Sequence, residues 1–224
     1  MDLSWHLQRI QEDCASYPGT LVLAVSKRVE AQRIRQAYAL GLRHFGENYV
    51  QEALNKQKTL GELAITWHFI GQIQRNKTEE IARHFHWVES LDREILVPRL
   101  GQAREGLPPL QVLIEVAISG EQGKGGVPPA EIAPLAEAIV AEPNLALRGL
   151  MALVHRDPAI AKENFRDMKT CFDKLRAQYP HLSIDTLSMG TSGDYAQALA
   201  AGATEIRLGT ALFGERSREA SFAG

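Results

Sequence analysis

Lys27 directly follows the segment Leu21–Ser26, whose apolar residues are typical of a strand that is buried on both faces. In parallel sheets of this kind, the chemically active side chains collect at the carboxyl ends of the strands. An amine held there and partly removed from water can be neutral enough to attack a carbonyl carbon. The alternative is a lysine whose charged head is simply solvated above an apolar stem.

Two later segments have the composition of an anion site. Ser188–Gly193 is a hydroxyl-rich and glycine-rich turn before a helical pattern, and Gly209-Thr210 follows the next strand. Free backbone N–H groups at the start of a helix, together with the helix dipole, attract an anion such as phosphate. Ser192 and Thr210 are also typical helix caps, and a cap and a phosphate site have nearly the same geometry.

The elements that must position these residues alternate along the whole chain. We expect helices over Leu3–Ala15, Val29–Leu40 and Ala159–Gln178, and eight strands over Leu21–Ser26, His44–Glu47, Trp67–Gly71, Trp87–Ser90, Val112–Ile118, Leu147–Leu153, Ile184–Ser188 and Glu205–Leu208. Strands separated by helical segments indicate parallel pairing. The pattern predicts an α/β protein, a single (β/α)8 TIM barrel over residues 1–224 with an extra N-terminal helix, and the structural alternative is an open doubly wound sheet.

Closure of such a barrel places the first strand beside the eighth. The amine of Lys27 and the anion site after the last two strands would then lie at the same end of the barrel. A ligand that spans them needs both a phosphate and an aldehyde. Pyridoxal 5′-phosphate carries both groups.

Composition excludes several other classes of protein. The 224 residues carry a formal net charge of −2, which provides no overall attraction to nucleic acid or to an anionic membrane. Cys14 and Cys171 match no ligand or redox spacing, so we expect free thiols, and the histidines show no metal-ligand spacing. We also expect no signal peptide, no membrane span and a cytoplasmic location.

Six segments together resemble one family, over about residues 5–214 and in the same order. They are Ala-Val-Ser-Lys at 24–27, His-Phe-Gly-Glu-Asn-Tyr-Val-Gln-Glu at 44–52, Trp-His-Phe-Ile-Gly at 67–71 with Gln74, Asn76 and Lys77, Leu-Arg-Gly-Leu-Met at 147–151, Leu-Ser-Met-Gly at 187–190 and Ile-Arg-Leu-Gly-Thr at 206–210. The chain thereby resembles the pyridoxal phosphate homeostasis protein family, which is similar to the barrel domain of alanine racemase.

The resemblance implies a fold-type III pyridoxal 5′-phosphate site in which Lys27 forms a Schiff base. It further implies that Arg207 faces the pyridine nitrogen, that Asn48 and His68 line the ring pocket, and that the phosphate is held by Ser192, Gly209 and Thr210. By default, however, His68 on an apolar strand is a hydrogen-bonded core histidine. An arginine remains protonated, so it donates to an unprotonated ring nitrogen and leaves the ring a weak electron sink.

The same resemblance also indicates whether the chain catalyses a reaction. Racemases of this type take a second acid or base from a separate carboxyl-terminal domain and a partner subunit, and we expect this chain to lack that domain. We therefore expect a monomeric carrier, with little or no catalysis, that maintains the cofactor pool and delivers it to apo-enzymes. The alternatives are an amino-acid racemase and a Schiff-base aldolase acting on a phosphorylated sugar.

Some positions depart from the family pattern or have no assigned role. Val29 and Thr191 stand where the family commonly has a basic residue and a methionine, which bears on cofactor affinity. Lys124 matches a family lysine and could make a second cofactor contact. Glu47 is a candidate general base or a residue that orients the neighbouring loop.

Overall fold

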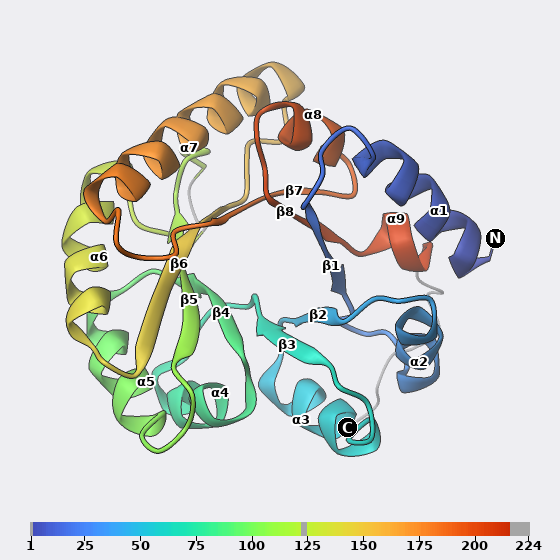
Figure 1. The fold of residues 1–224 in the computed structure, drawn as a ribbon, viewed down its shortest axis with the longest axis horizontal. Coiled ribbons are helices and arrows are strands. Elements are labelled where there is room, and N and C mark those ends of the chain that lie inside the picture. Colours follow the sequence, from blue (N-terminus) through green and yellow to red (C-terminus); the bar gives the residue numbers. More distant parts are fainter. Residues whose placement is uncertain (1, 122–124, 216–224) are drawn as a thin grey trace.

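The computed structural model describes residues 2–121 and 125–215, and within them parallel strands form a closed barrel (Figure 1). The strands are β1 (Leu21–Val25), β2 (His44–Glu47), β3 (Thr66–Phe69), β4 (Trp87–Leu91), β5 (Leu110–Val116), β6 (Leu145–Ala152), β7 (Thr186–Thr191) and β8 (Glu205–Leu208). Each strand pairs with its neighbours in chain order, and β8 pairs with β1. The predicted (β/α)8 TIM barrel is therefore confirmed, and the open sheet is wrong.

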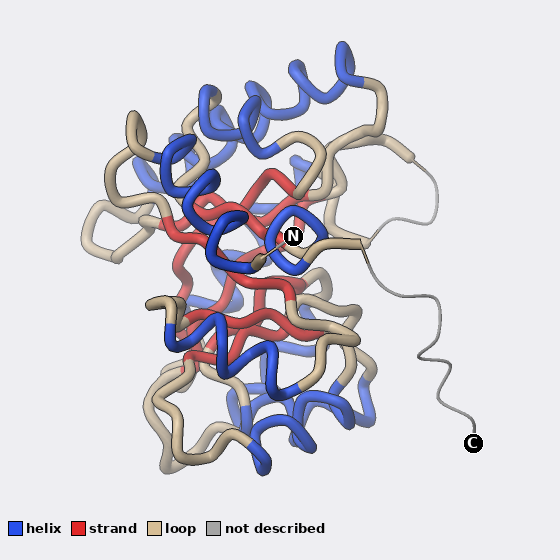
Figure 2. The backbone as a smooth tube through the Cα atoms, turned by 90° about the vertical axis from the view of Figure 1, so that its right-hand side faces the viewer, coloured by secondary structure: helices blue, strands red, loops and turns tan. Residues whose placement is uncertain are grey.

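Helices surround this barrel on all sides, as the view along the barrel and the view turned by 90° both show (Figures 1 and 2). They are α1 (Leu3–Cys14), α2 (Ala31–Ala39), α3 (Val50–Thr59), α4 (Thr78–His84), α5 (Val97–Ala103), α6 (Ile132–Ala141), α7 (Pro158–Gln178), α8 (Tyr195–Ala200) and α9 (Thr210–Phe213), with short 3-10 turns η1 (Arg75–Lys77), η2 (Glu94–Leu96) and η3 (Pro129–Glu131). None of the described helices combines the length and the apolar character needed to cross a membrane.

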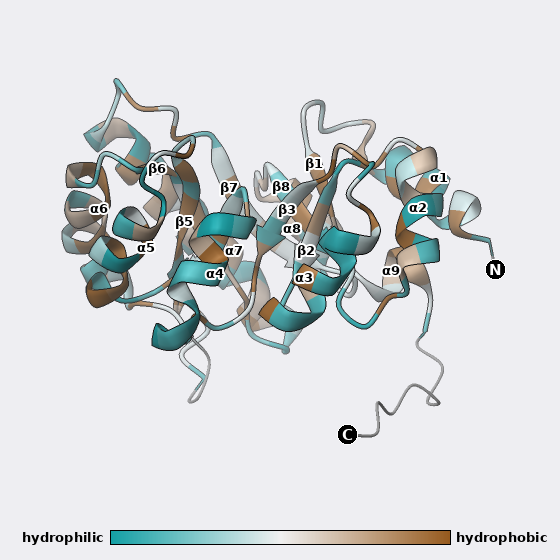
Figure 3. Cartoon of the chain, turned by 90° about the horizontal axis from the view of Figure 1, so that it is seen from below, coloured by the Kyte–Doolittle hydropathy of each residue, from teal (hydrophilic) through white to brown (hydrophobic). Residues whose placement is uncertain are grey.

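The longest helix, α7, shows how local sequence sets its boundaries and its buried face. The Asp157 carboxylate accepts from the Ala159 N–H at 2.9 Å, and Pro158 occupies the first turn, where its missing N–H costs nothing. Phe165, Met168 and Phe172 recur at helical spacing and are buried against the barrel. Figure 3 shows the resulting contrast between hydrophobic strands such as β5 and the largely hydrophilic surface of helices such as α4.

The extra N-terminal helix is also present. Leu3, Leu7 and Ile10 lie on one face of α1 and are buried. This face packs beside α9, the short helix that follows the last strand (Figure 1). The structure also confirms that Cys14 and Cys171 are free thiols, both half-buried.

Several predicted boundaries differ from those of the structure by one to three residues, and two of these differences lie near the site. The β7 strand continues past Ser188 to Thr191, because Gly190 adopts φ 95° and the pairing with β8 shifts register there. At the start of α2, Val29 is not helical, because its N–H closes a turn onto the Ser26 carbonyl at 2.9 Å. The loop after β7 therefore begins at Ser192.

Candidate functional site

The residues expected to bind a cofactor lie on five consecutive strands around the barrel, or just after them. In barrel order they are Ser192 after β7, Arg207 in β8, Gly209 and Thr210 after β8, Lys27 after β1, Asn48 after β2 and His68 in β3. The register pairs Leu23 of β1 with Arg207 of β8. Residues that are 180 positions apart in sequence (207 − 27) thus come from adjacent strands. Lys124 lies outside the described residues.

The loop after β7 and the start of α9 bring two backbone N–H groups to one point. The Ser192 Oγ accepts from the N–H of Gly209 at 3.3 Å and from the N–H of Ala211 at 3.0 Å. Thr191 is held separately, because its N–H and its hydroxyl both donate to Asp194, at 2.6 and 3.1 Å. Because both N–H groups converge on one oxygen, a phosphate oxygen could replace the Ser192 hydroxyl as their acceptor.

Arg207 points into the barrel, and only 4% of its surface is exposed. Its Nη1 donates to the Ser188 Oγ at 2.7 Å, and its Nη2 donates to the Ala152 carbonyl at 2.8 Å. Because these partners lie on β7 and β6, the guanidinium is fixed by two neighbouring strands. These bonds use two of its five N–H groups.

Beneath Arg207, a hydrogen-bonded chain of buried polar residues crosses the barrel. The Ser188 hydroxyl lies 2.9 Å from Glu89 Oε2 and 2.6 Å from Glu205 Oε1. Glu89 Oε1 lies 2.7 Å from the Nδ1 of His68, and the Nε2 of His68 lies 2.9 Å from the Nδ1 of His44. Since β4 and β7 are not neighbours, Glu89 and Ser188 can meet only inside the barrel.

Burial sets the protonation states of these hydrogen-bonded side chains. Together with the adjacent Glu89 carboxylate, burial raises the pKa of Glu205 to about 8, and burial is the larger cause. Burial also raises the pKa of Glu89, while the Arg207 charge opposes that effect. It lowers the pKa of His68 to about 4, so this imidazole is neutral. We conclude that Glu205 holds a proton near neutral pH and that Glu89 is the anion that balances Arg207.

His68, Glu89 and Glu205 also have ligand-type atoms within 4.8 Å of one another. Such a group could attract a cation. Here the positive charge is already supplied by Arg207, which binds the same Ser188 hydroxyl. The proton on Glu205 leaves that side chain neutral, and the positive charge of Arg207 balances the negative charge of Glu89.

This series of hydrogen-bonded polar residues is not predicted from the sequence. The structure joins Glu205 to Arg207 through the Ser188 hydroxyl. The available signal was an acidic residue inside a buried strand, as at Glu89 in β4, because such residues are almost never fully buried unless they are paired. Val29, at one of the positions that depart from the family pattern, is buried in the hydrophobic core.

Asn48 lies where β2 and β3 end side by side. Its Oδ1 is buried and has no hydrogen-bond partner among the described residues. Its backbone is in close contact with Gly71, where a Cβ would lie 2.2 Å from the Asn48 carbonyl oxygen. A buried acceptor without a partner is costly unless a ligand satisfies it.

The variant Gly71→Ala is expected to be destabilised by about 1–3 kcal/mol, because the added methyl group displaces the Asn48 backbone. Urea unfolding would measure the loss. Gly61→Ala is the matched control, since its Cβ would meet its nearest neighbour at an ordinary 3.5 Å. Equal stability of the two variants would contradict the close contact at Asn48.

Comparisons with known proteins agree with this geometry. The family model for the N-terminal domain of alanine racemase matches residues 2–217. A pyridoxal phosphate homeostasis protein of Pseudomonas aeruginosa is 49% identical over 203 residues, which cover 89% of this chain and 86% of the relative. A protein of the same name from Vibrio cholerae is 44% identical over 218 residues, covering 94% and 92%.

A solved structure is also similar to this chain in sequence and in fold. PipY of Synechococcus elongatus PCC7942, solved with PLP bound, is 34% identical and superimposes with a TM-score of 0.86. The match covers 95% of this chain and 100% of that chain. The same protein solved without PLP superimposes with a TM-score of 0.88.

Proposed function

Because this chain belongs to the pyridoxal phosphate homeostasis protein family, we propose that it binds pyridoxal 5′-phosphate at the carboxyl end of its barrel. Lys27 holds the cofactor as a Schiff base. The protein then acts in intracellular pyridoxal phosphate homeostasis, delivering the cofactor to apo-enzymes with little or no turnover. We further infer that it acts as a monomer, since one chain supplies every residue of the candidate site.

The observation that carries this proposal is the placement of three different groups on adjacent strands. The Lys27 amine follows β1, the Arg207 guanidinium lies in β8, and the N–H groups that converge on Ser192 come from the loop after β8. An aldehyde, a ring nitrogen and a phosphate are the matching groups of the ligand. The unpartnered Oδ1 of Asn48 is a further acceptor beside them.

The environment of Arg207 supports a carrier more than a catalyst. Pyridoxal 5′-phosphate supplies an electron-withdrawing ring that is most effective when its nitrogen is protonated. Arg207 can only donate a hydrogen bond there, because a guanidinium does not give up its proton. Ser188 and Ala152 hold this side chain in place, so we do not expect another residue to replace it at the ring.

The test is to mix the purified protein with pyridoxal 5′-phosphate, record visible absorbance, and then add each enantiomer of alanine. We expect a visible band from the bound cofactor and no conversion of one enantiomer into the other beyond that of free cofactor. An apo-form of a cofactor-dependent enzyme should then recover activity when it is mixed with the loaded protein. Rapid racemisation would replace the carrier with the racemase alternative.

A further inference from the structure

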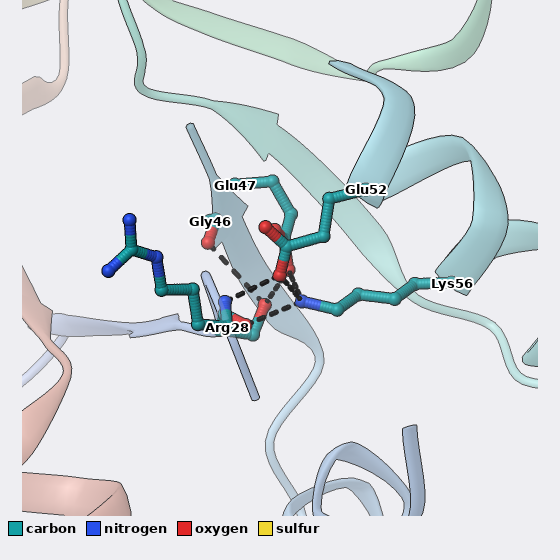
Figure 4. Close-up of polar contacts among 6 residues, drawn as sticks. Arg28, Gly46, Glu47, Glu52 and Lys56 are labelled. Carbon is teal, nitrogen blue, oxygen red and sulfur yellow. Dashed lines mark hydrogen bonds and ion pairs between the residues drawn. The ribbon is translucent and has the colours of Figure 1, made fainter. Parts of the chain in front are cut away.

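The two peptide groups on either side of Lys27 are both tied to helix α3. On one side, the Ser26 carbonyl accepts from the Nζ of Lys56 at 2.6 Å. On the other side, the Arg28 N–H donates to the Glu52 carboxylate. Figure 4 shows Glu47, Glu52 and Lys56 converging on this turn from β2 and α3. Lys27 is thus the central residue of a segment whose flanks are held by another element.

The ammonium group of Lys56 is fully used by this arrangement. It donates to the Ser26 carbonyl at 2.6 Å, to Glu47 Oε1 at 2.8 Å and to Glu52 Oε1 at 2.6 Å. Three acceptors match the three N–H groups of an ammonium. Lys56 is only 8% exposed and Glu47 is fully buried, so neither side chain is an ordinary solvated surface charge.

Glu47 adds a second bond to the same turn. Its Oε1 accepts from the Ser26 hydroxyl at 2.6 Å as well as from Lys56. Burial raises the pKa of Glu47, and the Lys56 charge acts in the opposite direction. Oε1 makes both of these bonds, and it is through this oxygen that Glu47 orients the turn, whereas Oε2 is buried without a hydrogen-bond partner among the described residues.

The backbone of the turn needs such support. Arg28 has φ 58°, and among the described residues it is the one that is not glycine and has a positive φ. The left-handed conformation costs an L-residue roughly 1–2 kcal/mol. The bond from its N–H to Glu52 offsets part of that cost, and it fixes the direction in which the chain leaves Lys27.

We propose that Glu47, Glu52 and Lys56 are positioning residues for Lys27, holding the turn 26–28 so that its amine meets the cofactor aldehyde. The inference rests on the proposed function and extends it to residues that do not touch the ligand. Their contribution is to the rate of covalent attachment. Recognition of the phosphate and the ring belongs to the separate groups on β7, β8 and the loop after β2.

The test uses the full chain with Glu52→Ala, which removes the acceptor of the Arg28 N–H, and Lys56→Met. We expect attachment of pyridoxal 5′-phosphate, followed by visible absorbance, to slow about 10- to 100-fold, as misplaced reacting groups commonly do. Pyridoxine 5′-phosphate has no aldehyde, so its binding should stay as tight as in the wild type. Amide hydrogen exchange at Arg28, measured without cofactor, should become faster.

Two matched controls carry the same substitutions on other helices. Glu79→Ala removes a charge that pairs with Arg83 at 3.2 Å on α4, and Lys169→Met removes the partner of Asp173 on α7. Both are i,i+4 pairs, as Glu52 and Lys56 are. Both controls should react with the cofactor at the wild-type rate.

The possible outcomes separate this inference from the proposed function. Wild-type rates in Glu52→Ala would overturn the positioning role, and so would equal losses of attachment and of pyridoxine 5′-phosphate binding. Glu52→Ala decides the matter alone if Lys56→Met does not fold, because Glu52 is the more exposed of the two side chains and its removal leaves the Arg28 N–H without this acceptor. If the wild type never reacts at Lys27, the proposed function fails. Unchanged hydrogen exchange at Arg28 in the variants would separately refute the idea that Glu52 and Lys56 hold the turn 26–28.

Discussion

Lys27→Ala is expected to abolish covalent attachment of pyridoxal 5′-phosphate while the barrel stays folded. The side chain is half-buried just after β1 and contributes little to the core, so its removal should cost little stability. Borohydride reduction followed by proteolysis and mass spectrometry should find a phosphopyridoxyl group on the peptide that contains residue 27. The same peptide from the variant should carry none, because no other nucleophile follows β1 at that point.

Lys58→Ala is the matched control for this experiment. Lys58 lies exposed on α3, and its replacement should leave the labelled peptide as it is in the wild type. If protein saturated with the cofactor carries the group elsewhere while Lys27 is unmodified, the Schiff base is refuted. A barrel that binds a phosphorylated sugar would then be the better description.

Glu205→Gln is expected to remove a large part of the stability that the protein loses as the pH rises towards about 8. Folding raises the pKa of Glu205 from 4.5 to about 8, mainly through burial, so the folded state keeps a proton that the unfolded state releases. Stability therefore falls as pH rises between these values, by about 1.4 kcal/mol per pH unit for this group. Glutamine stays neutral throughout and can still bond to Ser188.

The clearest window lies between about pH 6.5 and about pH 8. Below it, His44 and His68, whose pKa values are lowered to about 4 by burial, act in the opposite direction, because the unfolded state gains their protons. Urea unfolding across the window should show a flatter profile for Glu205→Gln than for the wild type. Glu163→Gln, at an exposed position of α7, should keep the wild-type slope. Parallel profiles for Glu205→Gln and the wild type would show that Glu205 is already ionised in the fold.

Much of the architecture could be predicted because it depends on local patterns. The apolar runs that predict strands correspond to all eight strands of the barrel, and the position of Lys27 after β1 follows from the same pattern. The end of β7 was missed because Gly190 continues the strand through a register shift, at a position where a Cβ would lie 2.5 Å from the Ala198 side chain of α8. Local sequence does not contain this contact.

The polar interior was missed for a different reason. Glu89 and Ser188 meet across the barrel, although 99 positions separate them in sequence and their strands are not neighbours. Lys56 has the sequence context of an exposed helical lysine, and it becomes buried only because two carboxylates and the Ser26 carbonyl surround it. Interactions of this kind depend on the three-dimensional register, which a periodic pattern does not specify.

The pairing of β1 with β8 has a consequence for how the protein matures. Lys27 and Arg207 become neighbours only when the first and last strands join, and that contact has the largest loop-closure cost in the barrel. A chain that has not completed this step lacks one side of the candidate site. Free cofactor would therefore bind the finished barrel and ignore its precursors, drawing folding towards completion by mass action. A ligand of the proposed site would in this way stabilise only those chains in which β1 and β8 have joined.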